Sequence, residues 1–194
     1  MATKTEPTIF VVDDEADIRD SLRLLMRSVG LKTETFASAQ EFLGAYDPSR
    51  PGCLILDVRM PGMSGPELQE KLRKNEINIP IIIITGHGDV PTAVRTMKAG
   101  AIDVIEKPFS DQLLLDRVQQ ALERDATDRK ERAERERIAA RLARLTPRER
   151  EVMEGIVDGK LNKVIAADLG LSTRTVEIHR SRIMEKMQVR SVSN

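Results

Sequence analysis

Short runs of apolar residues alternate with segments of helical period between Thr8 and about Leu122. This alternation is typical of a parallel β-sheet with helices on both faces. The first, third and fourth runs are almost wholly apolar, as strands buried on both faces must be, whereas the polar run at residues 32–35 is typical of an edge strand. Five strands are expected, at residues 9–12, 32–36, 53–56, 81–84 and 102–105.

Helical segments separate the expected strands. Gly30 and Gly100 end two of them, and Pro66 stands near the first turn of another, which are common boundary signals. The helices are expected at residues 16–29, 38–46, 66–75 and 91–99, with a fifth that begins near residue 111. The pattern therefore predicts an α/β fold with a five-stranded, doubly wound parallel sheet of the flavodoxin-like kind.

The C-terminal part of the chain, from residue 145 onward, has a helical pattern throughout. Residues 146–149 (TPRE) form a helix start, in which the threonine caps, the proline takes the first position and the glutamate completes a capping box. A short second helix at residues 162–169 stops at a glycine, and a third helix, capped by Ser172, runs to about residue 187. These helices predict a small all-α helix-turn-helix domain.

Residues 123–144, between these two regions, are dominated by charge, because six acids and eight bases fill 14 of the 22 positions. This composition favours an exposed helical linker stabilised by ion pairs three or four residues apart, each worth about 0.2–0.5 kcal/mol. A two-stranded coiled coil is the alternative, but Ile138, Leu142 and Leu145 supply barely one apolar seam.

The overall charge excludes a general attraction to nucleic acid or membranes, because 31 basic and 31 acidic side chains cancel. Any DNA affinity must come from a local patch, and the scarcity of aromatic residues favours duplex DNA over unpaired bases. The single cysteine, Cys53, lies in an apolar run and is expected in the core. Because the sequence has neither a signal peptide nor a run of about 20 apolar residues, we expect a cytoplasmic protein without membrane contact.

Polar side chains follow the expected strands at the edge of the sheet where ligands collect in parallel α/β folds. Asp13 and Asp14 follow the first strand, Asp57 the third, Thr85 ends the fourth and Lys107 follows the fifth. Three crowded carboxylates repel one another, and a divalent cation with oxygen ligands, such as Mg²⁺, relieves that repulsion. Each residue also has an ordinary structural explanation, namely helix capping, a surface ion pair or a bond to its own backbone. Their coincidence at successive strand ends favours a shared site.

Such a site could transfer a phosphoryl group to Asp57 as an acyl phosphate. Lys107 and the cation would neutralise charge on the phosphoryl oxygens, and the Thr85 hydroxyl would donate a hydrogen bond to one of them. Four motifs of this region resemble the receiver domain of response regulators over residues 8 to about 122. They are VVDDE (residues 11–15), DVRMPGMSG (57–65), IITGHG (83–88) and EKPF (106–109).

The resemblance implies that Asp57 accepts phosphate from a sensor histidine kinase. It also implies that Asp14, Asp57 and the carbonyl of Arg59 ligate Mg²⁺, with Asp13 acting through water. Thr85 and Lys107 would sense the phosphate, and the peptide bond before Pro108 would be cis. The sequence departs from the usual pattern at Val104, where an aromatic residue is common, so switching by rotation of an aromatic ring is in doubt.

The third C-terminal helix has two distinct faces. Val176, Ile183 and Met187 share a narrow arc that is expected to pack on the core, with His179 at its margin. The opposite face can reach base edges and phosphates if the helix enters a major groove, or it is merely a solvated polar face. It comprises Arg174, Ile178, Ser181 and Glu185, flanked by Glu177 and Arg182.

Three segments of this region, LTPREREV (residues 145–152), NKVIA (162–166) and STRTVEIHR (172–180), resemble the LuxR-type DNA-binding domain. Together with the receiver, the chain is similar to two-component response regulators of the FixJ type. This likeness implies a dimer on an inverted repeat, with base contacts from Glu177, Ile178 and Ser181. The remaining expected DNA contacts are Asn162, Lys163, Arg174, Thr175, Arg180 and Arg182. The family has a further helix after the position of residues 191–194, so either a tail is missing or assembly differs.

We therefore expect a receiver at residues 1–122, a charged helical linker at 123–144 and a helix-turn-helix domain at 145–194. The expected function is phosphorylation-dependent regulation of transcription by a homodimer with RNA polymerase as a partner, and the only catalysis is the receiver's own phosphoryl transfer and hydrolysis. Dimerisation through the fourth helix and fifth strand, or release of an inhibitory contact, could couple the domains. Two alternatives are a ligand-gated LuxR-type regulator and an aspartyl-phosphate phosphatase. The phosphatase would need a second aspartate at the position of Arg59.

Overall fold

The computed structural model describes residues 6–86 and 90–189 of the chain. It divides into two compact units, residues 1–129 and residues 130–194. The helices of the part described include none that is long and apolar enough to cross a membrane.

The first unit is built on a five-stranded parallel sheet in the order β2-β1-β3-β4-β5. This order confirms the predicted doubly wound fold and the place of the polar strand at an edge. Val12 of β1 lies opposite Leu56 of β3, and Asp57 lies opposite Ile84 of β4, so these strands end close to one another. The strands are β1 (Thr8–Val12), β2 (Lys32–Phe36), β3 (Gly52–Asp57), β4 (Ile81–Thr85) and β5 (Asp103–Glu106).

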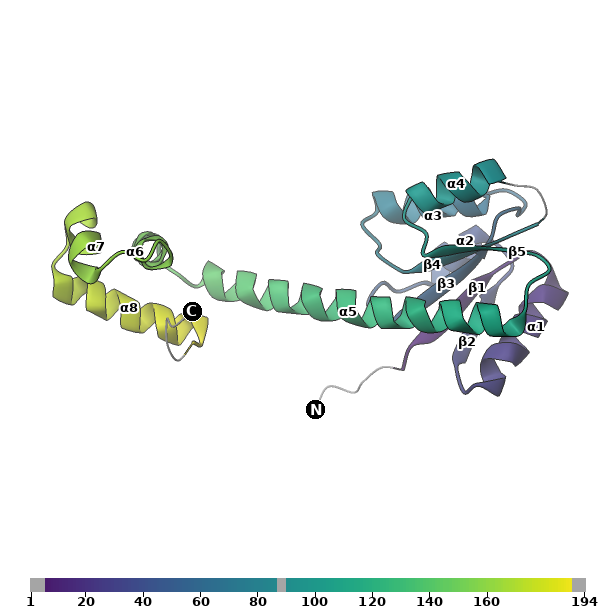
Figure 1. Ribbon diagram of the computed structural model, residues 1–194, viewed down its shortest axis with the longest axis horizontal. Helices are drawn as coiled ribbons and strands as arrows, with labels where there is room; N and C mark the ends of the chain where they lie inside the picture. Colours follow the sequence, from purple (N-terminus) through teal and green to yellow (C-terminus); the bar gives the residue numbers. More distant parts are fainter. Residues whose placement is uncertain (1–5, 87–89, 190–194) are drawn as a thin grey trace. The chain divides into compact units, whose positions relative to one another are not determined.

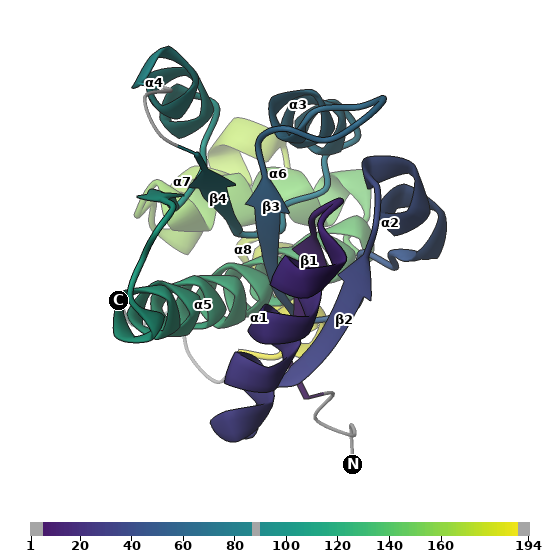
Figure 2. The ribbon, with the colours of Figure 1, turned by 90° about the vertical axis from the view of Figure 1, so that its right-hand side faces the viewer.

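Helices cover both faces of this sheet (Figure 2). Ile9 and Val11 of β1 point into the core shared with α1 and α5, whereas Phe10 and Val12 point into the core shared with α2 and α3. Cys53 is fully buried in the first of these cores, as predicted, and burial raises the pKa of its thiol. The helices are α1 (Ala16–Ser28), α2 (Ala39–Ala45), α3 (Gly65–Lys74), α4 (Val90–Lys98) and α5 (Asp111–Ala143).

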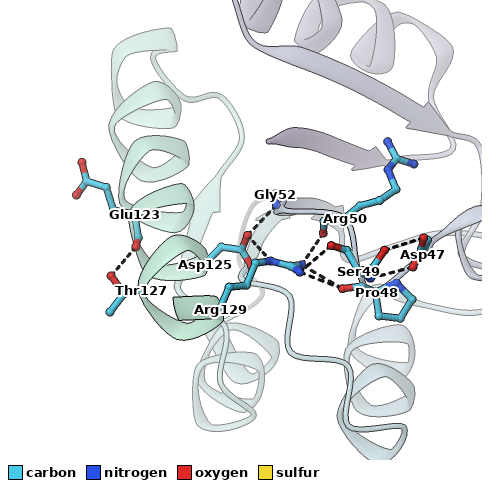
Figure 3. Close-up of polar contacts among 9 residues, drawn as sticks. All are labelled: Asp47, Pro48, Ser49, Arg50, Gly52, Glu123, Asp125, Thr127 and Arg129. Carbon is cyan, nitrogen blue, oxygen red and sulfur yellow. Dashed lines mark hydrogen bonds and ion pairs between the residues drawn. The ribbon is translucent and has the colours of Figure 1, made fainter. Parts of the chain in front are cut away.

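Helix α5 continues from the core of the first unit through the charge-rich segment (Figure 1). Three exposed pairs in it have the predicted spacing of three or four residues, namely Arg124–Asp128, Glu131–Arg135 and Glu134–Arg137. The first compact unit ends at Arg129, within the segment expected as linker. The polar contacts that hold this part of α5 are shown in Figure 3.

After the end of α5, the described residues of the second unit form three helices, α6 (Pro147–Val157), α7 (Asn162–Leu169) and α8 (Thr173–Met187) (Figure 1). Val152, Ile165 and Val176 meet in its core, one from each helix. A Cβ atom on Gly155 would lie only 2.9 Å from the Ile165 side chain, so glycine lets α6 and α7 approach closely. The predicted caps of α6 and α8 are present, and the predicted helix-turn-helix arrangement is confirmed.

Candidate functional site

The structure brings carboxylates from two strands together around one ammonium group. Asp13 follows β1 and Asp57 ends β3, and both side chains are buried. The Nζ atom of Lys107, which follows β5, lies 2.8 Å from Oδ1 of Asp57 and 3.2 Å from Oδ2 of Asp13. It also lies 3.8 Å from a carboxylate oxygen of Glu15. Residues far apart in the sequence therefore form a single polar pocket at the carboxyl edge of the sheet.

Burial and neighbouring charges shift the pKa values of this pocket. Burial raises the pKa of Asp13, and the Asp57 charge adds to that effect, while the Glu15 backbone N–H and Lys107 oppose it. Burial acts to lower the pKa of Lys107, but its hydrogen bond to Asp57 and the charges of Asp57 and Asp13 outweigh burial, so this pKa is raised. The raised pKa of Lys107 favours its charged form, and the raised pKa of Asp13 makes protonation of that carboxylate easier.

Backbone groups fix the orientation of both buried carboxylates. The Arg59 N–H donates to Oδ2 of Asp57 over 2.6 Å, and the Glu15 N–H donates to Oδ1 of Asp13 over 2.8 Å. The first residue of α3, Gly65, passes so close to Asp57 that a Cβ atom there would lie 2.2 Å from the Asp57 carbonyl oxygen. Only glycine lets α3 begin at this point, and the turn between β3 and α3 is fixed as a result.

The remaining residues predicted for this pocket lie around it. Asp14 is exposed and, with Arg59, lines a hollow of about 530 Å³. Thr85 is buried at the end of β4, where its hydroxyl donates to the carbonyl of Gly86 over 3.3 Å. Val104 is partly buried in β5 opposite Ile83 of β4. The Lys107–Pro108 peptide bond is cis, as the resemblance implied.

Arg19 of α1 holds the acidic loop and was not singled out from the sequence. Its Nη1 atom donates to the carbonyl oxygens of Asp13, over 2.7 Å, and Asp14, over 2.8 Å. The only available signal was a basic residue one turn into the helix after two acids. Arg23 and Arg27 are also basic residues of the same helix. The sequence alone therefore could not show that Arg19, and not one of these two, contacts the acidic loop.

The donor set of the pocket is suited to a magnesium ion, although the acids do not form a closed cage. Among residues 6–86 and 90–189, no group of three or more His, Cys, Asp or Glu side chains is placed to hold a metal. Mg²⁺, however, keeps several waters and takes only one or two protein carboxylates in most sites. Asp13 and Asp57 already converge on a cation, the Lys107 ammonium, and the exposed Asp14 stands beside them. The residues present therefore fit Mg²⁺.

The predicted DNA-contact residues lie outside the core of the second unit. Asn162, Thr175 and Arg180 are half-buried. The Thr175 hydroxyl lies 2.8 Å from that of Ser172, whose oxygen also accepts from the Thr175 N–H, so Thr175 forms part of the α8 cap. The exposed members are Lys163, Arg174, Glu177, Ile178, Ser181 and Arg182.

Two residues of α8 differ from a simple polar face. Ile178 is an apolar side chain 45% exposed among these polar groups, which suits contact with a thymine methyl group. His179 is half-buried, and its Nδ1 atom is buried with no hydrogen-bond partner within the described residues. That environment agrees with the packing role expected for His179.

The sequence matches two protein families and several known regulators over nearly its whole length. Residues 9–119 match the response regulator receiver domain, and residues 143–194 match the bacterial regulatory proteins of the luxR family. The transcriptional regulatory protein FixJ of Bradyrhizobium diazoefficiens is 46% identical over 97% of this chain and 92% of its own. The C4-dicarboxylate transport transcriptional regulatory protein DctR of Rhodobacter capsulatus is 45% identical over 96% of each chain. The solved structure of the response regulator StyR is similar with a TM-score of 0.89 and 48% identity, over 96% of this chain and 94% of that one.

Proposed function

Because the chain belongs to the transcriptional response regulators that join a receiver domain to a LuxR-type DNA-binding domain, we propose that phosphorylation of Asp57 by a sensor histidine kinase controls its action on DNA. The observation that carries this proposal is the contact between Lys107 and Asp57, at 2.8 Å, beside the buried Asp13. It places a nucleophilic carboxylate next to a fixed positive charge.

In the proposed reaction, an oxygen of Asp57 forms a bond to phosphorus while the bond from phosphorus to the donor's nitrogen breaks. The Arg59 N–H holds Oδ2 of Asp57, so the carboxylate does not have to reorient before attack. Lys107 neutralises negative charge on the phosphoryl oxygens, and Thr85, on the adjacent strand, offers its hydroxyl to one of them. The product is an acyl phosphate on Asp57.

Mg²⁺ would be held by Asp14, Asp57 and the Arg59 carbonyl, with Asp13 acting through water, and it would supply further charge neutralisation at the phosphoryl group. The protein's own contribution is the geometry of these groups. Arg19 and the Glu15 N–H keep the two acids after β1 in a defined loop, and the close approach of Gly65 defines the turn after Asp57.

Two couplings between phosphorylation and DNA binding are compatible with the chain. The first is dimerisation through α4 and β5, and it is supported by an exposed apolar stripe on α4, formed by Val90, Val94 and Met97. Their spacing of four and three residues places them on one side of the helix. The second is release of an inhibitory contact between the receiver and the DNA-binding domain. Val104 in place of an aromatic residue favours a switch that moves Thr85 and repacks α4 and β5.

On DNA, we propose that α8 enters the major groove and that two copies bind an inverted repeat. Glu177, Ile178 and Ser181 would contact base edges, with the Ile178 side chain against a thymine methyl group. The complex would then act on transcription together with RNA polymerase. The residues proposed to contact the DNA backbone or to shape the interface are Asn162, Lys163, Arg174, Thr175, Arg180 and Arg182.

The alternatives raised by the sequence have less support. A ligand-gated regulator would need an N-terminal domain with an apolar ligand pocket. Residues 9–119 match a receiver domain instead. A phosphatase of the haloacid-dehalogenase type needs an aspartate two residues after its nucleophile, and that position is Arg59.

Incubation of the full chain with acetyl phosphate and Mg²⁺ tests this proposal. Intact mass spectrometry should show addition of one phosphoryl group to the wild-type chain and none to Asp57→Asn. The phosphorylated chain should select an inverted repeat from random duplex DNA. Phosphorylation of Asp57→Asn to the wild-type level would show that another residue is the acceptor.

A further inference from the structure

Helix α5 carries an ion pair between a buried carboxylate and a half-buried arginine, which the phosphorylation chemistry does not use (Figure 3). Asp125 is only 3% exposed, and its Oδ2 atom accepts hydrogen bonds from the backbone N–H of Gly52, at 2.9 Å, and from Nε of Arg129, at 2.8 Å. Arg129 follows one helical turn after Asp125, and its Nε atom also lies 2.9 Å from Oδ1. The pair therefore joins α5 to the first residue of β3.

Arg129 also binds the loop between α2 and β3 through its guanidinium group. Nη1 donates to the carbonyl oxygens of Pro48, at 3.2 Å, and Ser49, at 3.0 Å. Nη2 donates to the carbonyl oxygens of Pro48 and Arg50. Figure 3 shows the guanidinium pointing from the helix into this turn of backbone. Arginine suits such a site because its donors form a rigid planar fork.

The loop that receives Arg129 is itself held in place. Asp47 accepts hydrogen bonds from the backbone N–H and the hydroxyl of Ser49, at 2.9 and 2.8 Å. The Arg50 side chain pairs with Glu34 of β2 at 2.9 Å and lies over the Phe10 ring, 4.9 Å from its centroid. The loop that presents the carbonyl groups to the guanidinium therefore has further contacts that do not involve the helix.

A neighbouring ion pair on the same helix, which is exposed to solvent, can be compared with the Asp125–Arg129 pair. Arg124 and Asp128 have the same spacing, but their side chains are 67% and 43% exposed. Pairs of that kind contribute little, because water solvates and screens both charges. Removing Arg129, by contrast, leaves the buried Asp125 carboxylate without its counter-charge, which is costly.

The apolar contacts of α5 with the receiver core end before this pair, at Ala121 and Leu122. We propose that Asp125 and Arg129 form a joint that fastens the start of the linker helix to the receiver, and that the effect of phosphorylation on DNA binding depends on this joint. The second half of the proposal rests on the proposed function. Without the contacts of Asp125 and Arg129, nothing else in the described part of the chain would hold residues 123–129 against the receiver. This part of the helix would then unfold locally more often.

Hydrogen–deuterium exchange of the full chain tests the first half. In Arg129→Gln, the amides of residues 123–130 should exchange about tenfold faster or more than in the wild type. The matched control Arg124→Gln removes the exposed pair and should leave those rates within about twofold. Equal rates in the two variants would overturn the joint. Arg129→Lys keeps the positive charge but loses the planar set of guanidinium donors. The exchange rates of this variant should lie between those of Arg129→Gln and Arg124→Gln.

DNA binding before and after acetyl phosphate treatment tests the second half. The ratio of the two affinities should fall in Arg129→Gln and stay at the wild-type value in Arg124→Gln, with intact mass confirming equal phosphorylation. An unchanged ratio in Arg129→Gln would overturn the functional role of the joint. A wild-type chain whose affinity does not respond to phosphorylation would overturn the proposed function instead, while the exchange result would still decide the joint. Should Arg129→Gln fail to fold, Arg129→Lys carries both measurements.

Discussion

Individual donors hold each carboxylate of the acidic pocket in place. Asp13 and Asp57 each accept one backbone N–H and one contact from Lys107, so neither buried carboxylate is left without a donor. A buried charge without a partner costs several kcal/mol, about 3–5 when one member of a buried pair is removed. The Lys107 ammonium consequently supplies the counter-charge that both buried carboxylates share.

Arg19 should act as a positioning residue for this pocket. Arg19→Gln removes the donor to the carbonyl oxygens of Asp13 and Asp14, so the loop that carries both acids loses its support. We expect Mg²⁺ affinity, measured by direct titration, to fall by about tenfold, with a matching fall in the phosphorylation rate. Arg19→Lys should recover part of both, since an ammonium group can still donate to one carbonyl.

Arg23 provides the control for this prediction, because it lies one turn later on α1. Its guanidinium contacts Asp20 and the hydroxyl of Thr35 and not the acidic loop. Arg23→Gln should leave Mg²⁺ affinity unchanged. Equal effects of the two glutamine variants would mean that Arg19 acts only through the general stability of α1.

At the scale of elements, the start of α6 depends on one buried carboxylate. Glu149 accepts from the Lys186 ammonium at 2.6 Å and from the Thr146 N–H at 2.8 Å, and so joins the first turn of α6 to the end of α8. The Lys186 contact, followed by the Thr146 N–H, lowers the pKa of Glu149 from 4.5 to about 2. Glu149→Gln should therefore lower the unfolding free energy of the second unit at neutral pH by about 1–3 kcal/mol.

The same pKa shift predicts a pH dependence. A carboxyl group whose pKa is lower in the folded state stabilises the fold fully above its unfolded pKa of 4.5, and this contribution is lost as the pH falls towards 2. Urea unfolding of the second unit should show this loss in the wild type and a flatter profile in Glu149→Gln. Glu151, whose pair with Arg148 is exposed, supplies the matched control. If wild type and Glu149→Gln had the same pH profile, the pH dependence would not arise from the Glu149 carboxyl group.

Most elements could be predicted from the sequence because the hydrophobic pattern and the boundary signals agree. The strand at residues 32–36 and the helix at 162–169 have the predicted bounds. The helical character and the exposed ion pairs of the charged segment were also predicted from its charge pattern, whereas its unbroken continuity with the helix that begins at Asp111 was not. Asp13, Asp57 and Lys107 could be grouped in advance because parallel strands end at one edge of the sheet.

The contacts that the sequence did not predict are those in which a common residue type has an uncommon environment. Asp125 and Arg129 have the same spacing as Arg124 and Asp128, and only the tertiary fold buries the Asp125 carboxylate while it leaves the other pair exposed. Arg19 differs from Arg23 in the same way. Periodicity reports which side of a helix is apolar, but it does not report which backbone carbonyl groups lie within reach of a long side chain.

At the scale of the whole molecule, the proposed phosphorylation site lies in one unit and the proposed DNA contacts lie in the other. A dimer formed by the receivers would carry two DNA-binding units, so the second half-site would be bound at an effective concentration of up to about millimolar. The gain in DNA affinity then requires no change in α8 itself. Coupling by dimerisation therefore needs no structural change in the DNA-binding unit. Dimerisation can be measured separately from DNA binding.

Val94 lies in the middle of the exposed apolar stripe of α4 and is 48% exposed. Val94→Asp should weaken dimerisation of the phosphorylated chain by about tenfold, since it places a charge in an apolar contact. Sedimentation velocity with and without acetyl phosphate measures the effect. Leu24→Asp on α1, where the side chain is 65% exposed, is the control and should dimerise normally. A phosphorylated wild-type chain that stays monomeric would favour release of an inhibitory contact instead.

The burial of Cys53 has a practical consequence. Its sulfur is inaccessible within the first unit, and burial raises the pKa of the thiol, so almost none of it is present as the thiolate that reacts with maleimides. If one cysteine were introduced on the exposed surface of each unit, these two would be labelled with fluorophores and Cys53 would not. Cys53 would therefore not have to be replaced. Energy transfer between two such dyes would follow the two units in a single molecule as phosphate is added and removed.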